Sequence, residues 1–143
     1  MSFLTPGKKN LITDVKGLYI GNSENELINT GSTILTCEDR FVASYKVLGG
    51  APGTRETDLL EPDKLVEKID ALVLSGGSAF GLEAASETVN LLRKDNKGYS
   101  VSNTKVPIVP SAIIFDLMNG GNKDWENNPC LLYTSDAADD DRS

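Results

Sequence analysis

The spacing of apolar residues predicts three extended segments in the first third of the chain. Residues 17–22 (GLYIGN) and 32–37 (STILTC) are short apolar stretches, and the second is rich in β-branched residues. Residues 41–48 (FVASYKVL) alternate with the strand period of two. The positions that share one face there are Phe41, Ala43, Tyr45 and Val47. Together these segments predict a sheet with one buried face.

Residues 71–98 carry the clearest local pattern, which predicts a strand, a glycine turn and a helix. Residues 71–75 (ALVLS) form an apolar run, and beyond Gly76 and Gly77 apolar residues recur at steps of three or four. Basic residues gather near the expected end of the helix, and Gly98 is the predicted stop. The helical positions are Phe80, Leu82, Ala85, Val89 and Leu92.

Three further segments have weaker patterns. Residues 62–69 (PDKLVEKI) predict a short helix, because proline is tolerated in a first helical turn. The prolines of residues 106–117 (VPIVPSAIIFDL) predict an extended edge or lining segment, followed from residue 111 by either a strand or the start of a helix. Residues 118–129 are polar and rich in glycine, and they predict a surface loop with Trp125 as its anchor.

The residues after position 48 predict a loop that has two interpretations. Four residues break any regular element there, namely Gly49, Gly50, Pro52 and Gly53. Arg55 and Asp58 follow in a dense polar run, where Arg55 could bind a carboxylate through its two-pronged guanidinium. We favour the other interpretation, a structural loop whose polar groups bind one another.

The glycine turn also has two interpretations. A turn before a helix can aim free backbone N–H groups at an anion or an oxyanion, or it can be a tight corner. Residues 76–81 (GGSAFG) fit neither the dinucleotide nor the phosphate-loop fingerprint, and Phe80 stands where a nucleophile elbow needs glycine. We therefore expect Ser78 to cap the helix rather than to act as a nucleophile.

Composition narrows the choice of compartment and chemistry. The 143 residues are 39% hydrophobic and 24% charged, which is ordinary for a soluble globular protein, and no apolar run approaches the roughly 20 residues that span a bilayer. The first ten residues lack the apolar stretch of a signal peptide, so we expect a cytoplasmic protein with no membrane partner. Cys37 and Cys130 are far apart and suggest neither a disulfide framework nor a metal site. No cofactor is predicted.

Charge and the absence of histidine exclude several functions. The net charge is −7 and no stripe of Lys or Arg stands out, which argues against a nucleic-acid partner. The chain contains no histidine, which excludes a Ser-His-Asp triad, a Cys-His dyad and an imidazole zinc site within it. Hydrolysis would need a base of another kind.

Four blocks of sequence resemble one known family. They are NLITDVKGLYIGN (10–22), GGAPGTRETDLL (49–60), LSGGSAFGLEAA (74–85) and VPIVPSAIIFDL (106–117). In this order they resemble the N-terminal half of the L-aminopeptidase/D-esterase family of self-processing hydrolases. That group includes D-aminopeptidases, β-peptidyl aminopeptidases and nylon-oligomer hydrolases.

The resemblance implies an α/β fold, a four-layer αββα sandwich made from one precursor that cuts itself before a Ser or Thr in its C-terminal half. The new N-terminal residue is then the nucleophile, and its α-amine, with a pKa of about 8, can serve as the base. Such chemistry suits a chain without histidine. The implied substrates are small peptides, amides or esters, and the implied assembly is an oligomer of processed heterodimers.

Nothing in this chain resembles the family's cleavage site, so the resemblance assigns it no catalytic nucleophile. We expect residues 1–129 to be the truncated N-terminal part, on the larger-subunit side, and to be inactive without the missing C-terminal half. Gly76, Gly77 and Ser78 match the family's glycine turn, which the resemblance implies as a pocket wall or oxyanion region.

Other matched positions depart from the family pattern. Phe115 and Asp116 match a segment where several relatives have Tyr-Asp, with the tyrosine hydroxyl near the nucleophile, and Phe115 lacks that hydroxyl. Ser111 stands where the β-peptidyl branch has an amine-binding glutamate, which argues against β-peptide specificity. Asn22 replaces a common histidine and Leu48 a common arginine, and we interpret both as tolerated differences.

The last residues, 130–143 (CLLYTSDAADDDRS), are expected to be non-native. Back-translation of the first eleven gives a codon series that resembles a sequencing-library adapter. The rival interpretation is an acidic tail with a short apolar anchor. Two alternatives to a hydrolase fragment stay open, a non-catalytic domain that binds small anions at the glycine turn and a structural subunit that pairs with a separately encoded half.

Overall fold

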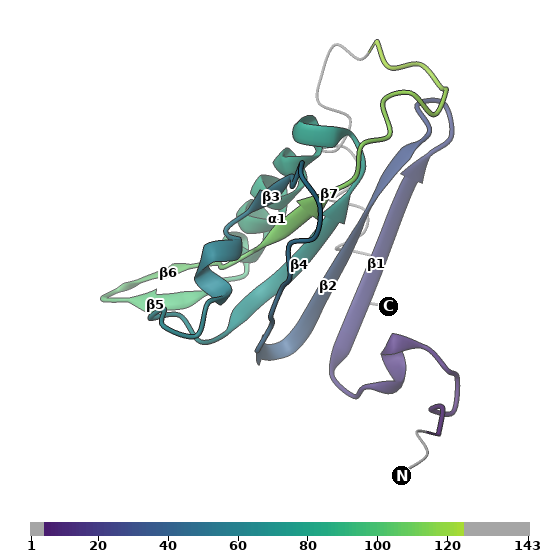
Figure 1. Ribbon diagram of the computed structural model, residues 1–143. Coiled ribbons are helices and arrows are strands. Elements are labelled where there is room, and N and C mark those ends of the chain that lie inside the picture. Colours follow the sequence, from purple (N-terminus) through teal and green to yellow (C-terminus); the bar gives the residue numbers. More distant parts are fainter. Residues whose placement is uncertain (1–4, 125–143) are drawn as a thin grey trace.

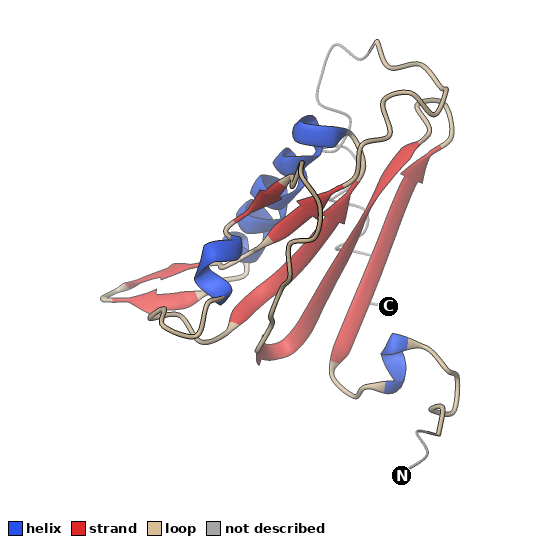
Figure 2. Ribbon diagram, viewed as in Figure 1, coloured by secondary structure: helices blue, strands red, loops and turns tan. Residues whose placement is uncertain are grey.

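The structure is a computed structural model that describes residues 5–124. A mixed five-stranded sheet carries one helix on one face (Figures 1 and 2). The strands in spatial order are β1 (Leu18–Asn25), β2 (Thr30–Phe41), β4 (Ile69–Ser75), β7 (Ser111–Ile113) and β3 (Thr54–Arg55). The remaining elements are α1 (Glu83–Lys94), the hairpin of β5 (Tyr99–Val101) and β6 (Thr104–Val106), and the 3-10 turns η1 (Ile12–Asp14), η2 (Thr57–Leu60) and η3 (Ser78–Leu82).

The sheet combines a long hairpin with a parallel crossover. β1 and β2 are antiparallel over eight residue pairs, and β2 is antiparallel to β4. β4 and β7 are parallel, and the chain between them passes through η3, α1 and the β5–β6 hairpin. β3 pairs antiparallel with β7 at the far edge. The predicted α/β class is confirmed, and a five-stranded sheet with one helix in the described residues is consistent with part of a larger fold.

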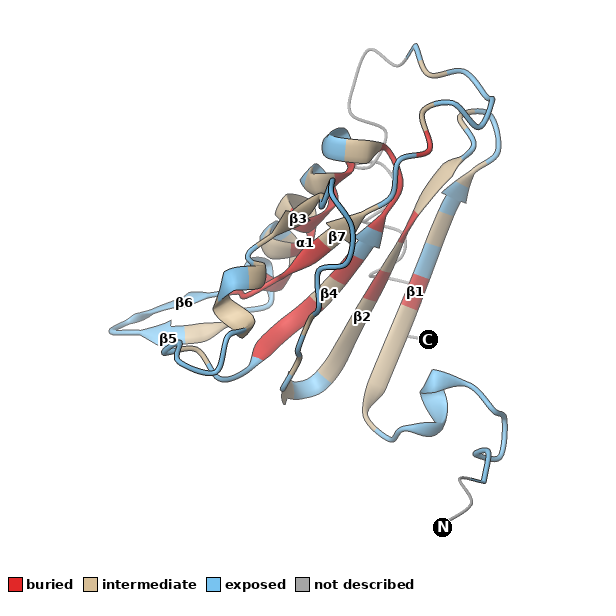
Figure 3. Ribbon diagram, viewed as in Figure 1, coloured by how far each residue is buried: buried red, intermediate tan, exposed pale blue. Residues whose placement is uncertain are grey.

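The core lies between α1 and the sheet. Small side chains at Ala71, Ala84 and Ala85 let the helix approach β4 closely, and Val89 packs against the same cluster. Figure 3 shows the buried positions running along β4 and into the side of α1 that faces it. The other core residues are Ile34, Val73, Leu92 and Val109.

The opposite face of the sheet is more open. Because side chains alternate along a strand, Leu72 and Leu74 point away from the helix that covers Ala71 and Val73. Leu74 is 50% exposed. The segment between β2 and β3 crosses this face (Figure 1), and it lines a hollow of about 410 Å³ together with Leu72 and Leu74. The sheet therefore has one closed face, as the sequence predicts.

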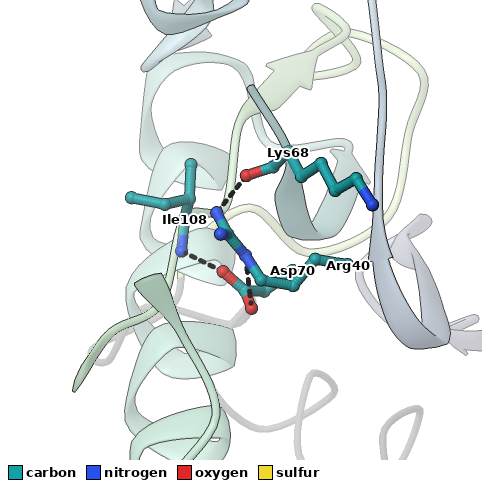
Figure 4. A network of polar contacts seen from close by, with 4 residues as sticks. All are labelled: Arg40, Lys68, Asp70 and Ile108. Atoms are coloured by element: carbon teal, nitrogen blue, oxygen red, sulfur yellow. Dashed lines mark hydrogen bonds and ion pairs between the residues drawn. The ribbon is translucent and has the colours of Figure 1, made fainter. Parts of the chain in front are cut away.

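An ion pair fixes the start of β4 (Figure 4). The Asp70 carboxylate lies 3.3 Å from Nε of Arg40 and accepts a hydrogen bond from the Ile108 N–H at 2.9 Å. Arg40 also donates to the carbonyl of Lys68 and stacks over the Tyr99 ring at 5.3 Å from its centroid. These contacts join β2, β4 and the segment that leads into β7.

Several predicted elements are confirmed. Residues 17–22 and 32–37 lie in β1 and β2, and the strand, glycine turn and helix of residues 71–98 appear as β4, η3 and α1. Two details are wrong. Phe80 is 56% exposed in η3 rather than on the buried helix face, and α1 ends at Lys94, before the predicted stop at Gly98. Asn96 takes the left-handed backbone conformation there, with a φ of 54°.

The predicted strand at residues 41–48 is wrong beyond Phe41, where β2 ends. Side-chain burial still alternates in this segment, since Ala43 and Tyr45 are partly buried and their neighbours are exposed. A strand also needs a neighbouring backbone to complete its hydrogen bonds, and this segment crosses the sheet face instead of pairing at an edge.

The predicted helix at residues 62–69 is also wrong. The segment is a turn that ends where Ile69 begins β4. A short helix needs an apolar stripe to bury, and Leu65 is 82% exposed. The local preference for a helix is not enough here, because the apolar side chain of Leu65 stays largely exposed in the described structure.

The proline-rich segment is interior rather than at the edge of the sheet. Residues 107–110 are buried, and β7 lies between β4 and β3, which settles the open choice at residue 111 in favour of a strand. Residues 118–124 form the predicted exposed loop. Trp125 and residues 130–143 lie outside the described residues. No helix within residues 5–124 has the length and apolar content needed to cross a membrane.

Candidate active-site cleft

A cleft of about 890 Å³ lies at the edge of the sheet where β4 and β7 end. Parallel strands bring their carboxyl ends to the same edge, so the glycine turn after β4 and the residues after β7 meet there. The cleft is polar, and its carboxylates come from Glu24, Glu26 and Asp116. The other lining residues are Asn22, Ser23, Asn25, Asn29, Thr30, Gly31, Ser32, Thr33, Gly76, Ile114 and Asn119.

A smaller, mostly apolar hollow of about 260 Å³ continues from the cleft onto the open face of the sheet. The two share Gly31, Thr33, Gly76 and Ile114. Beyond them the hollow runs over Leu74, Ala112 and Ile113. The edge of the sheet thus offers polar groups beside an apolar surface, an arrangement typical of small-molecule sites.

The glycine turn is shaped by close packing. A Cβ at Gly76 would lie 2.1 Å from both the Asp116 carboxylate and the Thr30 hydroxyl, so no side chain fits there. Gly77 has a φ of 83°, in the left-handed region that glycine adopts without strain. Ser78 follows with a φ of 54° and begins η3. The sequence predicted the turn, and these contacts explain its two glycines.

The N–H groups of the turn are all used within the chain. Gly76 donates to the Gly31 carbonyl at 2.9 Å and Ser78 to the Ile114 carbonyl at 3.0 Å. Gly77 donates to Oδ1 of Asp116 at 2.7 Å. Of the two interpretations of the turn, these bonds favour the tight corner over a turn with N–H groups free for an anion. Ser78 is not the helix cap either, because it lies inside η3, whose N-cap is Gly77, and the N-cap of α1 is Leu82; neither end has a side-chain cap bond.

Asp116 is the polar centre of the site. It is 9% exposed, and its second oxygen, Oδ2, accepts a hydrogen bond from the Thr30 hydroxyl at 2.6 Å. The Thr30–Asp116–Gly77 bridge joins the start of β2, the segment after β7 and the turn after β4. Phe115, its predicted neighbour in the site, is 65% exposed and lines neither hollow.

Two buried hydroxyl groups, those of Ser32 and Ser75, lie where β4 leads into the turn. The Oγ atoms of Ser32 and Ser75 are 2.8 Å apart, and both serines are buried. Ser75 also donates to the Gly76 carbonyl at 3.1 Å. Thr30, Ser32 and Ser75 were not predicted from the sequence, since the two serines meet only through the register of β2 and β4, and Thr30 meets Asp116 only in the fold. Their only signal in the sequence is a small hydroxyl residue at a strand end.

The exposed loop after Asp116 pins the tip of the β1–β2 hairpin. Asn122 N–H donates to the Leu27 carbonyl at 2.8 Å, and the Asn119 side chain donates to the Asn29 carbonyl at 2.9 Å. Lys123 also donates to the Asn29 carbonyl, at 3.2 Å. The far wall of the cleft is therefore held in place by residues that follow β7.

The loop before β3 has the contacts of a structural loop. Arg55 binds the Ser86 hydroxyl of α1 at 2.5 Å, not a carboxylate. The Gly53 carbonyl accepts from Ile113 at 3.0 Å, and Asp58 accepts from the N–H of Glu61 through its carbonyl at 3.3 Å. Of the remaining predicted loop residues, Pro52 lines the 410 Å³ hollow, Gly49 has a φ of 104°, and Gly50 has open space around it.

Ser111 does not reach the cleft. It is 1% exposed, and it pairs with Val73 in the sheet, on the face that α1 covers. Its Oγ has no hydrogen-bond partner within residues 5–124. The position where relatives of the β-peptidyl branch carry a glutamate is thus turned into the core of the described part of the chain.

Resolved pKa shifts fall outside the cleft. A hydrogen bond to Glu61, 2.8 Å long, raises the pKa of Tyr45 above its ordinary value. The exposed pair of Asp63 and Lys64 lowers the pKa of the carboxyl and raises that of the amine through their mutual hydrogen bond. Within the described residues, no three His, Cys, Asp or Glu side chains are grouped to hold a metal ion.

Comparison with known proteins agrees with the four motif blocks. A family model described as peptidase family S58 matches residues 10–140. Uncharacterized aminopeptidases of Mycobacterium bovis and Mycobacterium tuberculosis are each 41% identical over 128 residues, which is 84% of this chain and 36% of theirs. One from Mycobacterium leprae is 40% identical over 119 residues, 78% of this chain and 33% of its own.

The chain spans about a third of the length of these relatives. The matched region nonetheless covers most of the chain, including the glycine turn and Asp116. The resemblance drawn from the four blocks is confirmed, and the chain belongs to peptidase family S58.

Proposed function

We propose that this chain is the N-terminal part of a self-processing aminopeptidase-type hydrolase that cleaves peptides, amides or esters. The observation that carries the proposal is the meeting of two family motifs at one open cleft, where the turn after β4 lies against Asp116. Family membership and the aminopeptidase relatives support the reaction class. The nucleophile, a Ser or Thr freed by self-cleavage, would lie beyond this chain.

In this proposal the described residues supply one wall of the substrate site. Gly76 and Asp116 line the cleft, and Gly77 and Ser78 follow Gly76 in the turn that leads into η3. The exposed carboxylates of Glu24 and Glu26, together with the lining amides, would suit the free ammonium group of an aminopeptidase substrate, since opposite charges attract. Phe115 cannot supply the hydroxyl group of a tyrosine, so another group would orient the nucleophile.

The open face of the sheet supports the proposed four-layer sandwich. Leu74 and Ile114 are half or more exposed there, and apolar surface of this kind favours a covering layer. A second sheet from the C-terminal half would provide it. We further propose a cytoplasmic enzyme that assembles as an oligomer of processed heterodimers.

The anion-binding alternative has no supporting observation in the described residues. The Gly77 N–H that would receive an anion already binds the Asp116 carboxylate. Residues 130–143 remain proposed as non-native, and the family match itself runs to residue 140, so the boundary at residue 130 is a separate proposal. Genomic DNA sequence downstream of the codon for Pro129 tests that boundary directly.

The function is tested with the complete gene product that contains this chain. We expect it to release amino acids from chromogenic L- and D-aminoacyl anilides, amides or esters, because the family chemistry acts on an acyl group. Replacing the Ser or Thr at the cleavage site by Ala should abolish both self-cleavage and hydrolysis. An exposed control, Leu65→Ala, should leave both unchanged. Hydrolysis that survives loss of that Ser or Thr would contradict the proposal.

A further inference from the structure

The glycine turn directs a backbone N–H group at an anion, and that anion is a side chain of the same chain. Gly76 and Ser78 donate to backbone carbonyls, so the N–H of Gly77 is the donor of the turn that meets a charged group. That group is the carboxylate of Asp116, which lies 39 residues further along the chain. Its 2.7 Å distance is typical of a charge-assisted hydrogen bond.

We propose that Asp116 is a built-in anion that, together with Thr30, holds the glycine turn in place as a wall of the cleft. The proposal rests on the proposed function in that it takes the cleft as part of the substrate site. Asp116 and Thr30 are positioning residues, because they act through the turn and not on the reacting atoms.

Both oxygens of Asp116 are committed to this task. Oδ1 accepts from Gly77 and Oδ2 from Thr30, so the carboxylate bridges the turn to the start of β2. Gly76 is pressed against both partners, with no room for a Cβ. A shift of the carboxylate would therefore move the turn, and with it the part of the cleft that Gly76 lines.

The charge of Asp116 is balanced by donors and not by a cation. Its partners are an N–H and a hydroxyl, and no Lys or Arg within residues 5–124 forms an ion pair with it. Removal of the side chain would leave the Gly77 N–H without a partner beside an empty space of carboxylate shape. A small carboxylate such as formate should be able to enter that space and restore the bond.

The test uses the complete gene product with Asp116→Ala and sodium formate as the probe. Amide hydrogen exchange at Gly77 should become at least about tenfold faster in the variant, as expected for loss of a hydrogen bond to a charged group. Formate should slow that exchange again, whereas sodium chloride at equal ionic strength should not. Exchange at Gly77 in the wild-type protein should respond to neither salt, because the Asp116 carboxylate already binds the Gly77 N–H.

A conservative pair on Thr30 provides the second arm, which holds even if Asp116→Ala does not fold. Thr30→Val keeps the shape and removes the donor, so exchange at Gly77 should accelerate severalfold. Thr30→Ser keeps the donor and should behave as wild type. For hydrolysis, Thr30→Val should lower kcat more than it changes KM, since a displaced wall misplaces bound substrate, and Thr30→Ser should recover most of the lost kcat because it restores the donor.

Three results would overturn the proposal. They are unchanged exchange at Gly77 in Asp116→Ala, no formate effect in a folded variant, or equal behaviour of Thr30→Val and Thr30→Ser. Failure of the proposed function is separable, because a wild-type protein that neither cuts itself nor hydrolyses substrate leaves the exchange measurements at Gly77 fully informative.

Discussion

Two buried carboxylates at opposite ends of β4 have similar backbone contacts and different surroundings. Asp70 accepts from the Ile108 N–H and Asp116 from the Gly77 N–H, so each ties β4 or its turn to the chain beside β7. Asp70 is neutralised by Arg40 and lines none of the hollows described here, whereas Asp116 has a hydroxyl partner and lines the large cleft. The first arrangement closes the sheet, and the second holds the glycine turn at the edge that lines the cleft.

The largest expected effect is at the sealed end. Asp70→Ala should lower the free energy of unfolding by about 3 kcal/mol, because it orphans the Ile108 N–H and leaves Arg40 without its ion pair. Urea denaturation measures it. The exposed Asp63→Ala, which breaks only a surface pair with Lys64, is the control and should unfold like wild type. Equal losses in both variants would remove the distinction between a sealed and a surface carboxylate.

At the open end the next largest effect is expected from Gly76→Ala. Its Cβ would collide with Asp116 and Thr30, and the strain should cost about 2 kcal/mol in the free energy of unfolding. The control is Gly50→Ala, where a Cβ meets nothing within 4 Å, so no loss is expected. A Gly76→Ala protein as stable as Gly50→Ala would show that the turn is not held tightly against Asp116.

Two threonines on β2 sharpen the comparison further. Thr30→Val should cost about 1.5 kcal/mol of unfolding free energy, the usual worth of a hydrogen bond to a charged group. Thr33→Val removes only an exposed bond to Asn22 and should cost about 0.5 kcal/mol or less. Thermal denaturation of the two variants side by side gives the difference, and a reversed order would count against the Asp116 bridge.

The smallest effect concerns Tyr45 and pH. Because the bond to Glu61 raises the tyrosine pKa, its stabilising contribution is complete below the ordinary tyrosine pKa and is lost as pH rises through the raised one. Ultraviolet titration should show Glu61→Gln bringing the Tyr45 pKa down toward its ordinary value, with Tyr45→Phe identifying the signal. No difference between wild type and Glu61→Gln would refute the contact.

The sequence predicted those elements whose signals lie within one short segment of the chain, and it did not predict those that depend on distant residues. The run from Ala71 to Leu92 contains its own strand, turn and helix signals, so β4 and α1 were predictable. Residues 41–48 also alternate, and they fail to form a strand because no free sheet edge meets them. Pairing partners are a property of the fold, which a single segment does not encode.

The site divides in the same way. The two glycines and Asp116 were found as parts of family motifs, but their meeting required the parallel pairing of β4 with β7. Thr30 could not be singled out from its weak signal, a hydroxyl residue at a strand end, because its partner is 86 residues away. The sequence left open whether the N–H groups of the turn are free, because the carboxylate that satisfies the Gly77 donor comes from a distant part of the chain.

We proposed above that this chain is part of a hydrolase that cuts itself and works from the new terminus. Intact mass spectrometry of the complete gene product, with N-terminal sequencing of each fragment, tests it most directly. We predict two chains, the larger containing the residues described here and the smaller beginning with Ser or Thr. A single uncut chain in a folded, hydrolytically active protein would contradict the account.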